Sequence, residues 1–129
     1  MSENKKTILV VEDEVAMLKA IVAKLEKEDF TVLQATDGES GFSVAKDKKP
    51  DLVILDIIMP KIDGLTVMKK IRDEGGDWGK QVPMIMLTNL SDPESVADAA
   101  KYKVFDFLVK TDWRLDDIAD LVKKKIFTD

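Results

Sequence analysis

Five polar side chains lie just after four short apolar runs, and they are the residues of this sequence best suited to chemistry. They are Glu12, Asp13, Asp56, Thr88 and Lys110. An acid in such a position is usually a helix cap or a solvated turn, and a lone lysine is usually a surface residue. Because the same placement recurs along the chain, we expect the five side chains to meet at one place in the fold.

The charges of these residues indicate what they could do together. At about 4 Å and an effective dielectric constant near 20, each pair among three carboxylates costs about 4 kcal/mol. Lys110 alone cannot offset this repulsion, so we expect a hard divalent cation, and Mg²⁺ prefers oxygen ligands of this kind. The chain contains no histidine, so its chemistry near neutral pH depends on carboxylates, lysines and hydroxyls. We expect Asp56 to be ionised there and to act as a nucleophile without a general base.

Five apolar runs alternate with longer amphipathic stretches, and they predict the strands that position these side chains. The runs are Ile8–Val11, Phe30–Ala35, Leu52–Leu55, Met84–Leu87 and Phe105–Val109. Three of them are continuous, which is typical of strands covered on both faces. The second is interrupted by Thr31 and Gln34, so we place it at an edge. This alternation predicts an α/β fold with a parallel sheet, helices on both faces and ligand chemistry at the carboxyl ends of the strands.

Five helices are expected between and after these runs, each with an apolar stripe. The stripes are, from the first helix to the last, Val15, Met17, Leu18, Ile21, Val22 and Leu25; Phe42 and Ala45; Val67, Met68 and Ile71; Val96, Ala99 and Ala100; and Leu115, Ile118, Ala119, Val122 and Ile126. The stretch from Glu74 to Val82 contains three glycines and is the longest expected loop.

The composition predicts one globular domain over residues 1–129. A hydrophobic content of 45% supports a single core, and a formal charge of -5 disfavours binding to nucleic acid. The chain has no cysteine, which excludes disulfides. No apolar stretch approaches the roughly 18 residues of a membrane span, and the first residues lack the core of a signal peptide. We therefore expect a cytoplasmic protein with no nucleic-acid or membrane partner.

The segment from Pro50 to Gly64 contains an Asp-x-x-Met-Pro-x-x-x-Gly pattern that begins at Asp56. Together with Val10–Asp13, Met86–Thr88 and Phe107–Lys110, it resembles the receiver domains of bacterial response regulators, as in the single-domain chemotaxis regulators. The resemblance covers nearly the whole chain. It implies a flavodoxin-like, doubly wound (βα)5 sandwich, in which a five-stranded parallel sheet has the order 2-1-3-4-5.

The resemblance also implies a phosphoacceptor switch of two-component signalling, which is not an enzyme acting on a separate metabolite. Asp56 would accept a phosphoryl group from the phosphohistidine of a sensor histidine kinase or a phosphotransfer protein. Mg²⁺ would be held by Asp13, Asp56 and the backbone carbonyl of Ile58, and Glu12 would act through a bound water. The domain would catalyse only its own phosphorylation and slow autodephosphorylation.

Three further residues complete the implied switch. Thr88 and Lys110 would contact the phosphoryl oxygens, and Phe107 would rotate into the space that Thr88 leaves. This rearrangement would alter the face formed by the fourth helix, the fifth strand and the fifth helix, where an unknown protein target would read the state.

Five positions depart from the family pattern. One is Thr111, which follows Lys110 where the family usually has proline. Asn89 and the apolar Ile58 stand at the expected rim of the site and would hinder an attacking water, so we expect slow autodephosphorylation. Lys103 replaces a small glycine before the fifth strand, and Gly41 stands where the second helix usually has alanine. Neither of these two touches the chemistry.

The same residues bear on three alternative functions. A receiver-like interaction module that works without phosphorylation is the main alternative, although the intact acidic pair, Asp56, Thr88 and Lys110 argue against it. A phosphatase of the haloacid-dehalogenase type needs a second aspartate where Ile58 stands. A flavin-binding flavodoxin needs a first turn rich in serine and threonine, and this turn is acidic.

Overall fold

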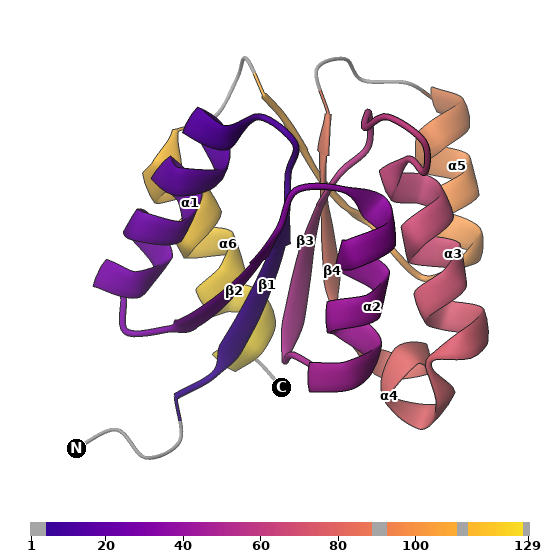
Figure 1. The fold of residues 1–129 in the computed structure, drawn as a ribbon, viewed down its shortest axis with the longest axis horizontal. Helices are drawn as coiled ribbons and strands as arrows, with labels where there is room; N and C mark the ends of the chain where they lie inside the picture. Colours follow the sequence, from indigo (N-terminus) through magenta and orange to yellow (C-terminus); the bar gives the residue numbers. More distant parts are fainter. Residues whose placement is uncertain (1–4, 89–92, 111–113, 128–129) are drawn as a thin grey trace.

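The centre of the molecule is a sheet of five parallel strands in the order β2-β1-β3-β4-β5 (Figure 1). The strands are β1 (Thr7–Val11), β2 (Thr31–Ala35), β3 (Leu52–Asp56), β4 (Met84–Thr88) and β5 (Asp106–Val109). The structure is a computed structural model that describes residues 5–88, 93–110 and 114–127. The strand order and the edge position of β2 confirm what the sequence predicted.

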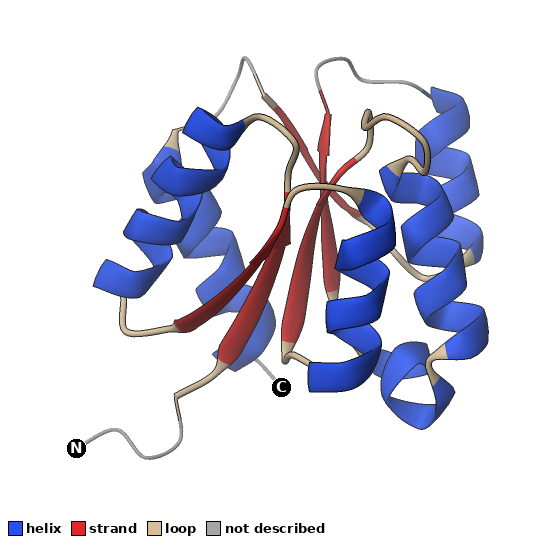
Figure 2. Ribbon diagram, viewed as in Figure 1, coloured by secondary structure: helices blue, strands red, loops and turns tan. Residues whose placement is uncertain are grey.

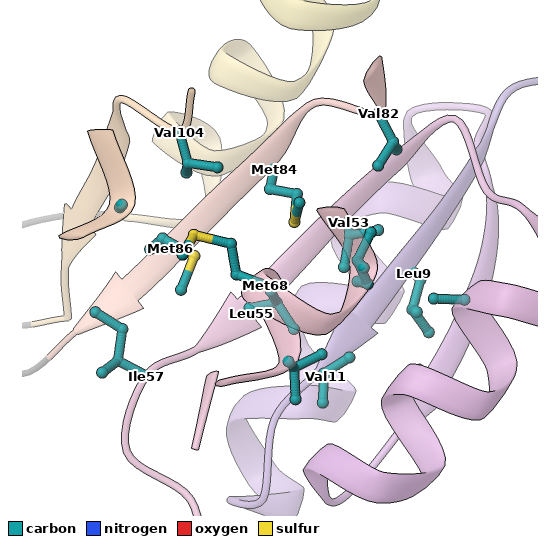
Figure 3. Packing of buried hydrophobic residues seen from close by; sticks show 14 of the residues in the cluster. Leu9, Val11, Val53, Leu55, Ile57, Met68, Val82, Met84, Met86 and Val104 are labelled. Atoms are coloured by element: carbon teal, nitrogen blue, oxygen red, sulfur yellow. The ribbon is translucent and has the colours of Figure 1, made fainter. Parts of the chain in front are cut away.

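Successive residues of the central strands point to opposite faces of the sheet, so each face buries its own apolar cluster. Leu9 and Val11 of β1 pack into one cluster, whereas Ile8 and Val10 pack into the other. Figure 3 shows the first cluster, in which Met68 lies against strand residues. Because both faces are covered, β3 and β4 are buried along their whole length, as their continuous apolar runs predict.

Helices form the two outer layers (Figure 2). Two helices, α1 (Val15–Lys27) and α6 (Leu115–Phe127), cover one face and bury the stripes around Leu18 and Ile118. The other face is covered by α2 (Gly38–Lys48), α3 (Gly64–Glu74) and α5 (Pro93–Lys101). The resulting three-layer sandwich is the fold that the sequence predicts.

The predicted stripes are inward-facing with two exceptions. In α1, Leu18, Ile21, Val22 and Leu25 are buried. Val15, however, is 54% exposed, and Val96 of α5 is 40% exposed. Each residue lies near the start of its helix, just after the carboxyl end of a strand. The prediction that these two side chains face inward, which rested on the 3.6-residue period alone, was therefore wrong.

The expected loop after α3 contains an additional short helix, α4 (Gly76–Gln81), so the prediction of a loop over Glu74 to Val82 was wrong there. Three glycines make a helix intrinsically unfavourable in this stretch, and tertiary contacts overcome that preference. The indole nitrogen of Trp78 donates a hydrogen bond to the carbonyl of Pro50 at 2.7 Å. Arg72 donates to the carbonyls of Gly79 and Val82 at 2.8 and 2.7 Å.

Within the described parts of the chain, no helix has the length and apolar character needed to span a bilayer.

Candidate functional site

The strand ends bring the predicted polar residues to one edge of the sheet. Asp56 is the last residue of β3 and pairs in register with Leu87 of β4, so Thr88 lies one residue beyond it. Glu12 directly follows β1, which is the other neighbour of β3. Lys110 directly follows β5, and its backbone N–H donates to the carbonyl of Thr88. The parallel arrangement therefore produces the predicted convergence.

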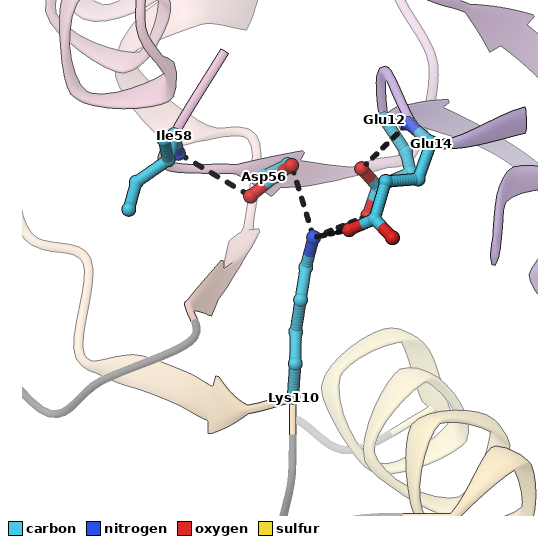
Figure 4. Close-up of polar contacts among 5 residues, drawn as sticks. All are labelled: Glu12, Glu14, Asp56, Ile58 and Lys110. Atoms are coloured by element: carbon cyan, nitrogen blue, oxygen red, sulfur yellow. Dashed lines mark hydrogen bonds and ion pairs between the residues drawn. The ribbon is translucent and has the colours of Figure 1, made fainter.

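The ammonium of Lys110 lies between three carboxylates (Figure 4). Its Nζ is 3.0 Å from Oδ2 of Asp56, 2.8 Å from Oε1 of Glu12 and 3.1 Å from Oε1 of Glu14. The side chains of Lys110, Asp56 and Glu12 are 5%, 3% and 0% exposed, respectively. The inner part of the site is therefore a buried cation with two buried acids, and Glu14 closes it from the solvent side.

Glu12 is held in place from both sides of its carboxylate. Its Oε2 accepts a hydrogen bond from the backbone N–H of Glu14 at 3.1 Å. Its Oε1 is within ion-pair distance of Lys110 but has no hydrogen bond of acceptable geometry to any described residue. This oxygen is fully buried with part of its bonding capacity unused, which favours a further positively charged or hydrogen-donating group at this point.

Burial raises the pKa of Asp56 to about 7. The neighbouring Glu12 carboxyl adds to this rise, and the hydrogen bond from Lys110 opposes it. This corrects the expectation that Asp56 is fully ionised at neutral pH, because the sequence did not show how completely the aspartate is buried. Burial alone would lower the pKa of Lys110, but its contacts with Glu12, Asp56 and Glu14 outweigh that effect and hold it above the usual value.

The remaining negative charge fits a metal ion. Glu12, Asp13 and Asp56 each offer one carboxylate oxygen, and these three oxygens lie within 4.8 Å of one another. Oxygen donors in this arrangement suit a hard divalent cation such as Mg²⁺. A bound cation would also stabilise the ionised form of Asp56, because an opposite charge nearby favours the carboxylate.

The turn after β3 explains why the motif ends in glycine. The N–H of Gly64 donates to the carbonyl of Ile57 at 2.8 Å, and a Cβ at position 64 would lie 2.2 Å from the carbonyl oxygen of Asp56. Only glycine permits α3 to begin this close to the end of β3. The backbone N–H of Ile58 then reaches Oδ1 of Asp56 at 3.3 Å, so the turn orients the carboxylate.

The other predicted residues occupy different places around this centre. Thr88 is buried, and Phe107 is half-buried against the apolar cluster on the α3 side. The side chain of Ile58, which the sequence predicts at the rim of the site, is 61% exposed. Asn89 lies outside the described residues.

Sequence reasoning missed one residue of the site, Glu14. The sequence places it third in a row of acids after β1, and that run was the available signal. An acid that precedes a helix is expected to cap it, but the side chain of Glu14, the N-cap residue of α1, makes no capping hydrogen bond. Its carboxylate is therefore available to Lys110.

A family model described as the response regulator receiver domain matches residues 8–123 of this chain. The chain therefore belongs to the receiver domain family of two-component response regulators, which are signalling domains. It is 36% identical over 110 residues to a probable transcriptional regulator, ycf27, of Cyanophora paradoxa. That alignment covers 85% of this chain and 44% of the relative.

Two other known proteins show how the length and the fold of this chain compare with those of its relatives. The chain is 40% identical over 85 residues to the alkaline phosphatase synthesis transcriptional regulatory protein PhoP of Bacillus subtilis, covering 66% of this chain and 33% of that protein. It therefore spans less than half the length of these curated relatives. Its fold is similar to that of the chemotaxis protein CheY4 of Vibrio cholerae, with a TM-score of 0.85 at 22% identity, covering 93% of this chain and 98% of the other.

Proposed function

We propose that residues 1–129 form one receiver domain that accepts a phosphoryl group on Asp56 and thereby switches a protein-binding face. The observation that carries this proposal is the buried contact between Lys110 and Asp56 at 3.0 Å, in a site where the carboxylate oxygens of Glu12, Asp13 and Asp56 lie within 4.8 Å of one another. A buried lysine that bridges acids at strand ends has little value for stability alone. It suits a site where further negative charge arrives.

The chemistry is an in-line displacement at phosphorus. A carboxylate oxygen of Asp56 forms a bond to phosphorus while the P–N bond of a donor phosphohistidine breaks, and the electron pair leaves with the imidazole nitrogen, which takes up a proton. Positioning and charge neutralisation do most of the work in such a transfer. Lys110 is already within hydrogen-bond distance of the nucleophile, and the hydroxyl of Thr88 would hold a transferred oxygen.

Magnesium is part of the proposal. Asp13, Asp56 and the backbone carbonyl of Ile58 would hold the ion, and Glu12 would act through a water. When bound, Mg²⁺ would offset the charge of the carboxylates and of the incoming phosphoryl oxygens. In an NMR titration, amides of residues 12–14 and 56–58 should shift saturably with Mg²⁺. Unchanged signals at high Mg²⁺ would contradict the metal site.

The output face would be formed by α5, β5 and α6, with Phe107 as the residue that couples it to Thr88. Phe107 is half-buried, so it can change rotamer without unfolding the core. Addition of beryllofluoride and Mg²⁺ should shift NMR signals across these three elements. Changes confined to the ends of β1 and β3 would argue against a switch.

The central experiment is phosphorylation by a small donor. Acetyl phosphate or phosphoramidate with Mg²⁺ should add one phosphoryl group to the intact protein, as measured by mass spectrometry. Asp56→Asn should abolish the addition, whereas Asp77→Asn, at an exposed acid of α4, should leave it unchanged. Persistent labelling of Asp56→Asn would place the acceptor elsewhere. A wild-type protein that cannot be labelled would favour the interaction module that works without phosphorylation.

A further inference from the structure

A charged cavity lies at the end of the sheet opposite Asp56. It has a volume of about 320 Å³ and is lined by Arg72, Asp73, Lys80, Lys101, Tyr102 and Lys103. These residues come from the end of α3, from α4, and from the end of α5 with the turn into β5. Figure 1 shows α4 below α3, far from the strand ends that carry the acids. We call this cavity the basal pocket.

The charge of the basal pocket is opposite to that of the protein. Its four basic side chains and one carboxylate give a net formal charge of +3, whereas the whole chain carries -5. Lys80 and Lys103 make no ion pair with any described residue, and Lys101 has only a 3.9 Å contact with Asp98 on the surface. Cations gathered in a concave site attract anions more strongly than the same charges on a flat surface.

Arg72 provides the second observation. It is only 9% exposed, and its Nε and Nη1 donate to the carbonyls of Tyr102, Gly79 and Val82. No carboxylate of the described residues pairs with this guanidinium, and its Nη2 donates no hydrogen bond to them. Buried charges are usually paired, and here only backbone dipoles compensate the guanidinium. An anion in the basal pocket would supply the missing counter-charge.

We propose that the basal pocket binds a small anion with two linked phosphate groups, such as a diphosphate or a phosphorylated metabolite that contains one. Guanidinium and ammonium groups together suit phosphate oxygens. A net formal charge of +3 matches a diphosphate better than a single phosphate. The volume of about 320 Å³ lies at the lower end of small-molecule pockets, which favours a compact ligand over a macromolecule.

The backbone at Lys103 makes a clean test possible. Lys103 has φ +62°, and the N–H of Val104 donates to the carbonyl of Ala99 at 3.0 Å in the manner of a glycine-terminated helix end. Lys103→Gly therefore removes a charge without disturbing the turn. Combined with Lys80→Ala on the exposed face of α4, it removes two cations while Arg72 keeps its structural contacts. The matched control is Lys19→Ala with Lys27→Ala, two exposed lysines of α1.

The experiment is a pyrophosphate titration in Mg²⁺-free buffer at about 0.15 M salt, followed by NMR and calorimetry. Wild type and the Lys19/Lys27 control should show saturable shifts at amides of residues 80 and 101–104. The Lys80/Lys103 variant should bind about tenfold more weakly or worse, since two phosphate contacts are lost. Asp56→Asn should bind as wild type does, which separates this pocket from the phosphoacceptor site.

Three results would overturn the proposal. They are non-saturable shifts, equal weakening in the Lys19/Lys27 control, and shifts centred on residues 12–14. Saturation of the same amides by an acidic peptide, with no response to pyrophosphate, would show instead that the basal pocket is a protein contact.

Discussion

The ammonium of Lys110 lies 3.0 Å from the carboxylate of Asp56, and both side chains are almost fully buried. This contact partly neutralises the charge of the site. Glu12, which is 0% exposed, shares the same lysine, so two buried carboxyl groups face one buried ammonium. The ionisation of these buried groups therefore affects both the free energy of unfolding and the chemistry of the site.

The first prediction concerns Asp56→Asn. The folded-state pKa of Asp56 is about 7, against an ordinary value of 3.8, so ionisation destabilises the fold increasingly as the pH rises between those values. Asparagine cannot ionise. Without Mg²⁺ at pH 7.5, the variant should be more stable by about 1–4 kcal/mol, as measured by urea denaturation. The gain should shrink below pH 4, and Mg²⁺ should stabilise the wild type more than the variant. Lower stability of the variant at every pH would contradict this account.

The second prediction concerns the lifetime of the proposed acyl phosphate on Asp56. Ile58 is apolar and 61% exposed at the rim of the site, where it cannot orient a water. Ile58→Gln should shorten the lifetime by about threefold to tenfold, because the amide of glutamine can hydrogen-bond to the attacking water and orient it. The decay of the phosphorylated mass species measures this directly. Ile58→Val, which stays apolar, should decay at the wild-type rate, and a wild-type lifetime of only seconds would refute slow autodephosphorylation.

The third prediction concerns Gly41→Ala in α2. A Cβ at this position would lie 2.8 and 2.9 Å from the two methyl carbons of Val11, which is fully buried in β1. Overpacking should destabilise the domain by about 1–3 kcal/mol, although alanine favours the helix more than glycine does. In a double-mutant cycle, Gly41→Ala should be less harmful in a Val11→Ala background. Additive losses would show that the two residues do not compete for space.

The sequence could predict the central strands because helices cover both faces of the sheet, which makes the apolar runs of these strands continuous. It could also predict the meeting of Glu12, Asp13, Asp56 and Lys110, because parallel strands end at one edge. It could not predict α4, since that helix depends on the hydrogen bonds of Arg72 and Trp78 rather than on its own glycine-rich residues. The raised pKa of Asp56 could not be predicted from the sequence either, because it depends on burial in the finished fold.

The fourth prediction concerns Arg72. Its three hydrogen bonds, at 2.7, 2.8 and 2.7 Å, join α3 to the ends of α4 and α5. Arg72→Met keeps the apolar stem but leaves these carbonyls without a donor, and it should destabilise the domain by about 2–5 kcal/mol. Arg72→Lys should lie between wild type and Arg72→Met, since an ammonium cannot reproduce the planar fork. A change of less than about 0.5 kcal/mol in Arg72→Met, within the range of ordinary surface substitutions, would contradict this role.

The fifth prediction concerns acid sensitivity where α1 meets α6. Hydrogen bonds from Lys123 and Lys24 lower the pKa of Glu28 and Asp116, respectively. A lowered pKa means that their stabilising contribution is complete above the ordinary values of 4.5 and 3.8 and is lost as the pH falls through the lower folded-state values. Glu28→Gln with Asp116→Asn should therefore flatten the fall of the urea midpoint below pH 4.5. Glu26→Gln, at an exposed neighbour, should leave the profile as it is in the wild type.

The indole of Trp78 donates a hydrogen bond to the carbonyl of Pro50. The fluorescence of this tryptophan can therefore report on the position of α4. Trp78 is half-buried beside the apolar cluster, so detachment of α4 would move its ring into water and shift its fluorescence to longer wavelength. The chain has two tryptophans, and replacing Trp113 with phenylalanine would isolate the signal. The rate at which α4 detaches could then be measured by stopped-flow fluorescence, separately from any change at the carboxyl ends of the strands around Asp56.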